Sequence, residues 1–177
     1  MNLPNKLTIV RIILAPLYLV LLVINFPHHY LAAMIVFIVA SLTDMLDGKI
    51  ARKYNLVTNF GKFMDPIAVK LLVSSAFIAF VQMGLLPAWI VIILIAREFI
   101  ISGFRLVASD AGIVLAASWW GKFKTAFQMI MCILLIINID NKVMDVVELV
   151  FVYISLALSV ISLIDYLVKN RKVIADM

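Results

Sequence analysis

The sequence predicts an all-α polytopic membrane protein, a bundle of six transmembrane helices with both termini in the cytoplasm. Composition, the lengths of the apolar segments and the distribution of basic residues support this prediction. Of the 177 residues, 66% are hydrophobic and 14% are charged, and the mean hydropathy is +1.16. Soluble domains are closer to half apolar, so the composition excludes a water-soluble fold. The length suits a single membrane domain, 1–177.

Six segments approach the ~20 apolar residues that cross a bilayer core. They are residues 7–25, 31–47, 62–83, 87–107, 117–139 and 144–168. The first contains Pro16, which should kink it, and the second runs into SLTDMLDGKIARK. The third begins with GKFMDP, the fourth carries AREF, the fifth opens near WWGKFK and the sixth ends before KNRK.

The basic residues predict how these segments are oriented. Lysines and arginines concentrate at both ends of the chain and in the connections after the second and fourth segments, whereas the other three connections contain only Lys142. By the positive-inside rule, both termini are therefore expected in the cytoplasm. The net charge of +5 then suits anionic headgroups or phosphorylated substrates at that face. No separate basic soluble domain exists, so nucleic acid is not expected as a partner. The single cysteine, Cys132, excludes an intramolecular disulfide framework.

Three carboxylates gather at the predicted cytoplasmic ends of the second and third segments. Asp44 and Asp47 are three residues apart and share one helix face, and Asp65 follows after a polar loop. Unpaired carboxylates are strongly disfavoured near a membrane interior. One or two hard divalent cations, with a shell completed by substrate phosphates, would explain the cluster. Ordinary helix caps and Asp–Arg pairs at helix ends are the alternative.

The spacing around these aspartates carries a resemblance. It reads Asp44-x2-Asp47-Gly48-x2-Ala51-Arg52-x8-Gly61-x3-Asp65-x3-Val69. This resembles the CDP-alcohol phosphatidyltransferase signature D-x2-D-G-x2-A-R-x8-G-x3-D-x3-D. The stretches LPNKLTIVRI, KYNLVTNFGKFMDP, AREFIISGFRL and ASWWGKFKTAFQM look like the phosphatidylglycerophosphate synthases of that family. The likeness covers nearly the whole chain.

The resemblance implies transfer of a phosphatidyl group from CDP-diacylglycerol to glycerol 3-phosphate, giving phosphatidylglycerophosphate and CMP. It implies a homodimer in the inner (cytoplasmic) membrane, in contact with membrane lipids, with the active site facing the cytoplasm. It also implies two divalent ions, Mg²⁺ or Mn²⁺. Their ligands would be Asp44, Asp47 and Asp65. The CDP-binding residues would be Asp44, Gly48, Ala51, Arg52 and Gly61.

The acceptor carries a phosphate dianion, which requires cations. The candidates near the predicted cytoplasmic ends of the fourth and fifth segments are Arg105, Lys122 and Lys124. Arg97 lies deeper beside Glu98 and is interpreted either as part of an ion pair between helices or as a substrate ligand. Thr8 and Arg11 match family positions near the active site.

The pattern departs from the family at its last position. The resemblance implies a fourth aspartate there, as a metal ligand and as the general base, whereas this chain has Val69 one helical turn after the retained Asp65. Valine can neither bind a cation nor accept a proton. We therefore expect a folded but severely impaired synthase, or a non-catalytic paralogue that binds CDP-diacylglycerol or metal. A phosphatidyltransferase with another acceptor alcohol and a small ion transporter are further alternatives, although the carboxylates lie at one membrane face only.

Overall fold

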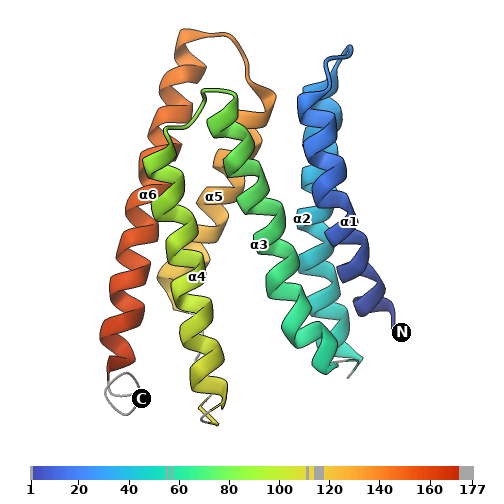
Figure 1. Cartoon of the computed structure of the whole chain (residues 1–177), viewed down its shortest axis with the longest axis vertical. Coiled ribbons are helices and arrows are strands. Elements are labelled where there is room, and N and C mark those ends of the chain that lie inside the picture. Colours follow the sequence, from blue (N-terminus) through green and yellow to red (C-terminus); the bar gives the residue numbers. More distant parts are fainter. Residues whose placement is uncertain (1, 55, 57, 111, 114–117, 172–177) are drawn as a thin grey trace. The chain divides into compact units, whose positions relative to one another are not determined.

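In the computed structural model, all of the regular secondary structure that is described is α-helical. The structure describes residues 2–54, 56, 58–110, 112–113 and 118–171, with side chains there except at residues 45, 47–49, 51, 52, 59, 62, 63 and 110. The helices in these ranges are α1 (Leu3–Val23), α2 (His29–Lys53), α3 (Asn59–Gln82), α4 (Ala88–Asp110), α5 (Trp119–Ile137) and α6 (Lys142–Lys169) (Figure 1). The predicted all-α class is confirmed, with one helix at each apolar segment.

Four of the described helices are long and apolar enough to cross a membrane. They are Leu3–Val23, Met64–Gln82, Trp119–Ile137 and Lys142–Lys169. The apolar part of α2 is shorter, His29–Asp44, because the helix continues through the charged motif to Lys53. Since these stretches need an apolar solvent, the protein is an integral membrane protein.

Polar side chains cap the N-termini of three of the described helices. The Asn2 side-chain oxygen accepts the backbone N–H of Asn5 at 3.1 Å and caps α1. The Thr58 hydroxyl accepts the N–H of Gly61 at 3.0 Å and caps α3, and Asn141 caps α6 in the same way. Such caps satisfy N–H groups that have no partner within the helix. The cap at Thr58 thus marks the start of α3, three residues before the motif glycine Gly61.

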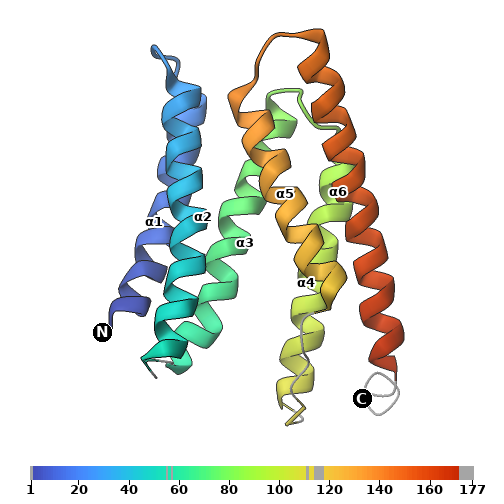
Figure 2. The same ribbon diagram turned by 180° about the vertical axis from the view of Figure 1, so that it is seen from behind.

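The chain divides into two compact units. The first contains Met1–Leu85 and Cys132–Asn138, and the second contains Leu86–Met131 and Ile139–Met177. In the first unit α1 lies against both α2 and α3 (Figures 1 and 2). Its packing includes the rings of Tyr18 and Phe37, whose centroids are 5.5 Å apart. Fully buried alanines on α2, Ala33 and Ala40, allow the backbones to approach closely, as small residues do between membrane helices.

In the second unit α4 packs against α6 (Figure 2). Phe104 of α4 meets Tyr166 of α6 edge to face, with centroids 5.8 Å apart. Phe127 of α5 and Phe151 of α6 are also 5.8 Å apart. The buried face of α6 contains three serines, Ser155, Ser159 and Ser162. Polar side chains on such a face seek partners on neighbouring helices.

Candidate active site

The buried face of α1 becomes polar toward its N-terminus. Ala15, Tyr18 and Leu22 recur every three or four residues and are buried, and the same periodicity continues back to Arg11 and Thr8. Residues at this spacing lie on one side of a helix. Packing of the apolar part therefore directs Thr8 and Arg11 toward α2 and α3. Both side chains belong to residues with 0% exposure.

Arg11 joins α1 to the first aspartate of the motif. Its Nη1 lies 2.8 Å from Asp44 Oδ1, and its Nε donates to the carbonyl oxygen of Ala40 at 3.2 Å. Ala40 and Asp44 are one turn apart on α2, so the guanidinium spans that turn. The Asp44 side chain keeps 37% of its surface exposed. It is thus held by a buried cation while its own surface stays accessible.

Thr8 provides a similar link to Asp65 on α3. The Thr8 hydroxyl donates to Asp65 Oδ1 and lies 3.1 Å from the carbonyl oxygen of Pro4. Because Thr8 and Arg11 are three residues apart, one face of α1 contacts both carboxylates. Asp44 and Asp65 are distant in the chain, and the structure brings both to the same face of α1.

The start of α3 is tied to the start of α1. The Thr58 hydroxyl lies 2.8 Å from Asn5 Oδ1, and the Asn2 amide donates to Leu56 O at 2.6 Å. Gly61 lies among these groups: a Cβ there would stand 3.3 Å from Asn5 Oδ1 and 3.5 Å from Asp65 Oδ2. The absent side chain thus leaves room for oxygen atoms of the chain itself.

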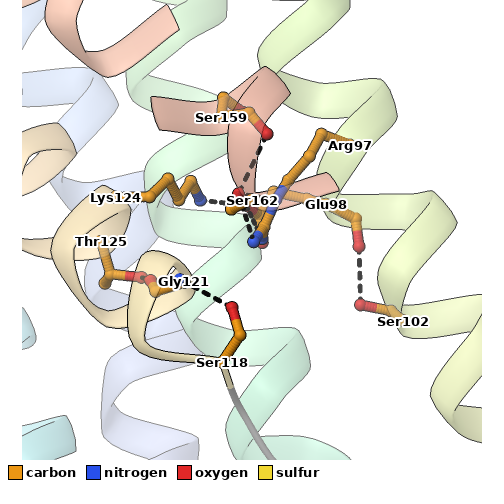
Figure 3. Close-up of polar contacts among 9 residues, drawn as sticks. All are labelled: Arg97, Glu98, Ser102, Ser118, Gly121, Lys124, Thr125, Ser159 and Ser162. Carbon is orange, nitrogen blue, oxygen red and sulfur yellow. Dashed lines mark hydrogen bonds and ion pairs between the residues drawn. The ribbon is translucent and has the colours of Figure 1, made fainter. Parts of the chain in front are cut away.

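A buried ionic cluster joins the three helices of the second unit (Figure 3). Arg97 of α4 donates through Nε and Nη2 to the Ser162 hydroxyl at 3.1 and 2.9 Å, and its Nη1 lies 3.0 Å from Glu98 Oε1. The ammonium of Lys124 on α5 pairs with the same Glu98 oxygen. Arg97 and Lys124 are 8% and 3% exposed. Gly121 makes room for the guanidinium, since a Cβ there would lie 3.6 Å from Arg97 Nη2.

The other two predicted acceptor cations have different surroundings. Arg105 Nε donates to the Tyr166 hydroxyl at 3.3 Å, with its guanidinium carbon 5.7 Å from the ring centroid. Lys122 is exposed, and its ammonium lies 4.5 Å from the centroid of one ring of Trp119. All three cations lie in the second unit, each with its own aromatic or acidic partner.

Comparison with known proteins identifies the family. Residues 1–161 match the family model described as CDP-alcohol phosphatidyltransferase. The chain belongs to the CDP-alcohol phosphatidyltransferase family. It is 43% identical to a CDP-diacylglycerol–glycerol-3-phosphate 3-phosphatidyltransferase of Bacillus subtilis, over 96% of this chain and 95% of that protein. It is 36% identical to the protein of that name from Haemophilus influenzae, over 94% and 91%. A probable phosphatidylglycerophosphate synthase of Mycobacterium tuberculosis is 34% identical, over 95% and 81%.

The predicted metal ligands of this phosphatidyltransferase are placed only in part. Asp44 and Asp65 offer carboxylate oxygens, the donors that Mg²⁺ and Mn²⁺ prefer, and Asp44 is partly accessible. This donor chemistry fits a divalent ion, on which the family generally depends. The described side chains contain no group of three acidic, histidine or cysteine residues suited to a metal. The third predicted ligand, Asp47, lies outside that set, as do the side-chain positions of three predicted CDP-binding residues: Gly48, Ala51 and Arg52.

Several contacts of this phosphatidyltransferase were not predicted from the sequence. Asn5 and Thr58 anchor the N-terminus of α3, and Ser162 shares the Arg97 guanidinium. The sequence pattern that could have indicated Ser162 is the helical spacing of the serines at 155, 159 and 162. The pattern that could have indicated Asn5 is the continuation of the buried side of α1 toward its N-terminus.

Val69 lies on α3 one turn after Asp65 and is partly exposed.

Proposed function

We propose that this chain transfers the phosphatidyl group of CDP-diacylglycerol to glycerol 3-phosphate, giving phosphatidylglycerophosphate and CMP for phospholipid biosynthesis. The relatives named for this reaction cover nearly all of the chain. The observation that carries the proposal is the pair Asp44 and Asp65, two motif carboxylates from separate helices that one face of α1 holds.

The reaction is a displacement at phosphorus. The acceptor hydroxyl oxygen forms a bond to the β-phosphorus of CDP-diacylglycerol and its proton passes to water. The bond from that phosphorus to the bridging oxygen breaks, and CMP leaves with the electron pair. A divalent ion held at the motif carboxylates would supply positive charge that favours the displacement. The residues proposed to hold it are Asp44, Asp47 and Asp65. Those proposed to bind CDP are Asp44, Gly48, Ala51, Arg52 and Gly61.

The acceptor phosphate is proposed to bind in the second unit. The cations proposed for it are Arg105, Lys122 and Lys124. Lys124 pairs with Glu98, which Arg97 also contacts, so a phosphate bound there would meet two cations. Charge-assisted hydrogen bonds to a phosphate are the stronger ones.

Val69 leaves the proposed reaction without a side chain at this position that accepts the proton of the hydroxyl. The attacking hydroxyl must lose a proton, and a carboxylate one turn after Asp65 would lie on the same helix face. Valine offers no oxygen there. General-base assistance contributes ~10²–10⁴-fold in rate, so the chain is proposed to be impaired by that order.

The Val69→Asp variant tests both the reaction and the defect. The purified parent and variant receive CDP-diacylglycerol, glycerol 3-phosphate and Mg²⁺ or Mn²⁺, and CMP release is followed. We expect turnover in Val69→Asp and much slower release in the parent. Val69→Asn is the matched control, because its amide has nearly the size of the carboxylate and cannot act as the base. Equal turnover in the parent and in Val69→Asp would refute the assigned role of position 69.

A non-catalytic role is the second candidate, and Val69 is the observation that favours it. Such a protein would bind CDP-diacylglycerol or Mn²⁺ without releasing CMP. This role predicts that neither the parent nor Val69→Asp releases CMP in the assay, although both bind CDP-diacylglycerol saturably. Turnover in Val69→Asp would show that this fold supports catalysis. A non-catalytic role would then apply only to the parent sequence with Val69.

The membrane placement is proposed as six spans in the inner (cytoplasmic) membrane, with both termini and the active site at the cytoplasmic face. The distribution of lysine and arginine supports it. In that position the acyl chains stay in the bilayer while CMP and glycerol 3-phosphate exchange with the cytosol. We also propose that the whole chain, 1–177, acts as one domain and assembles as a homodimer, as the family resemblance implies.

A further inference from the structure

We propose that α1 is the support that orients the metal-binding carboxylates, with Arg11 positioning Asp44 and Thr8 positioning Asp65. This inference rests on the proposed function, because it assigns a role toward the divalent ion. Neither α1 residue is proposed to touch the ion or the substrates. Their role is to restrict the carboxylate conformations through contacts behind the site.

The contacts of Arg11 are those of an orienting group. The guanidinium bonds Ala40 O through Nε and Asp44 Oδ1 through Nη1, so two donors fix its plane relative to one turn of α2. Arg11 is 0% exposed, whereas the Asp44 side chain remains partly exposed. The cation therefore lies on the protein side of the carboxylate. Arginine suits this position because its donors form a rigid planar fork, which lysine lacks.

Thr8 restrains Asp65 from the same helix face. Its hydroxyl is fully buried between the Pro4 carbonyl and Asp65 Oδ1, so it has few other orientations available. The bond engages Oδ1 of Asp65, while Oδ2 faces the space left by Gly61. Partners of this kind, which hold a ligand rather than the metal, typically contribute about 10–100-fold to metal affinity or activity.

A purely structural ion pair would be the simpler interpretation, and it predicts a different outcome. Loss of a structural contact lowers the unfolding temperature and leaves the metal affinity of the folded protein unchanged. Loss of a positioning contact weakens metal binding in protein that is still folded. The experiment must therefore measure both quantities on the same samples.

The test uses the full-length chain in detergent, titrated with Mn²⁺ and followed by the electron paramagnetic resonance signal of free Mn²⁺. Thr8→Val removes the hydroxyl at nearly constant volume, and we expect about 10–100-fold weaker Mn²⁺ binding. Thr8→Ser keeps the donor and should restore the parent affinity. Arg11→Lys keeps the charge without the fork and should also weaken binding. Thr125→Val is the matched control, because the Thr125 hydroxyl bonds only a carbonyl one turn back among its described contacts.

A second readout separates positioning from a general loss of activity. In the Val69→Asp background, Thr8→Val should lower kcat more than it raises KM for glycerol 3-phosphate, because the acceptor contacts are unchanged. Circular dichroism and thermal unfolding of each variant establish that the protein compared is folded. If Thr8→Val cannot be purified folded, Thr8→Ser and Thr8→Ala supply the same comparison of donor present and donor absent.

The outcomes distinguish this inference from the proposed function. Asp65→Asn and Asp44→Asn should weaken Mn²⁺ binding if the metal site is assigned correctly. If they do so while folded Thr8→Val and Arg11→Lys bind as the parent does, the positioning role is wrong and the proposed function stands. If neither asparagine variant changes Mn²⁺ binding, the proposed metal site itself is wrong and the inference falls with it.

Discussion

Glu98→Gln should be among the most destabilising substitutions in the second unit. Glu98 is the shared acidic partner of Arg97 and Lys124, which are 8% and 3% exposed. Glutamine keeps the size of the side chain and removes its charge, so two buried cations, one on α4 and one on α5, lose the carboxylate that they share. Breaking a buried pair in this way costs about 3–5 kcal/mol in the free energy of unfolding. For a chain of this length that corresponds to roughly 6–20 °C in Tm.

The assay is thermal unfolding in detergent, followed by far-UV circular dichroism. Lys169→Ala is the matched control, because Lys169 pairs with Asp165 at 2.7 Å but its side chain is 62% exposed. An exposed pair of that type contributes about 0.3–0.5 kcal/mol, so its Tm should hardly change. The variant Lys124→Met leaves Arg97 paired with Glu98 and should cost less than Glu98→Gln. Equal Tm values for Glu98→Gln and Lys169→Ala would refute the reasoning that burial makes this carboxylate essential.

Two further predictions concern the motif glycine and the topology. Gly61→Ala should be less favourable for Tm than Gly103→Ala, because its Cβ would stand 3.3 Å from Asn5 Oδ1 and crowding there offsets the gain in helix stability that alanine brings. At Gly103 a Cβ would meet open space, so Gly103→Ala should raise Tm, because alanine stabilises the helix by ~0.5–1 kcal/mol relative to glycine. Equal Tm shifts in the two variants would contradict the packing argument. For topology, single cysteines are introduced into a cysteine-free background at Lys6, His28 and Lys169. The first and last should react with a membrane-impermeant thiol reagent only from the cytoplasmic side and the middle one only from outside; the reverse pattern would overturn the positive-inside assignment.

The helical class and the position of every helix were predictable because they depend on local properties. A run of apolar residues in lipid must satisfy its backbone hydrogen bonds internally, and a helix does so within one segment. The chemistry was indicated by the motif rather than by periodicity alone: helix periodicity places Asp44 and Asp47 on one face of α2, and the resemblance of the whole spacing to the family signature adds Asp65 on α3. The helix ends were less predictable, since α2 runs past its apolar part to Lys53 and α3 begins at its Thr58 cap.

The partners of the polar side chains required the folded chain. Nothing local to Thr8 and Arg11 indicates that one will contact Asp65 and the other Asp44, because these contacts arise from the way α1 packs between two helices. Lys124 looked like an acceptor ligand in the sequence, and the fold gives it Glu98 as an ion-pair partner. Hydrogen bonds and ion pairs between helices act over a few ångströms, so their partners follow from packing rather than from sequence separation. Local sequence thus accounts for the helices, and packing accounts for which charged side chains meet.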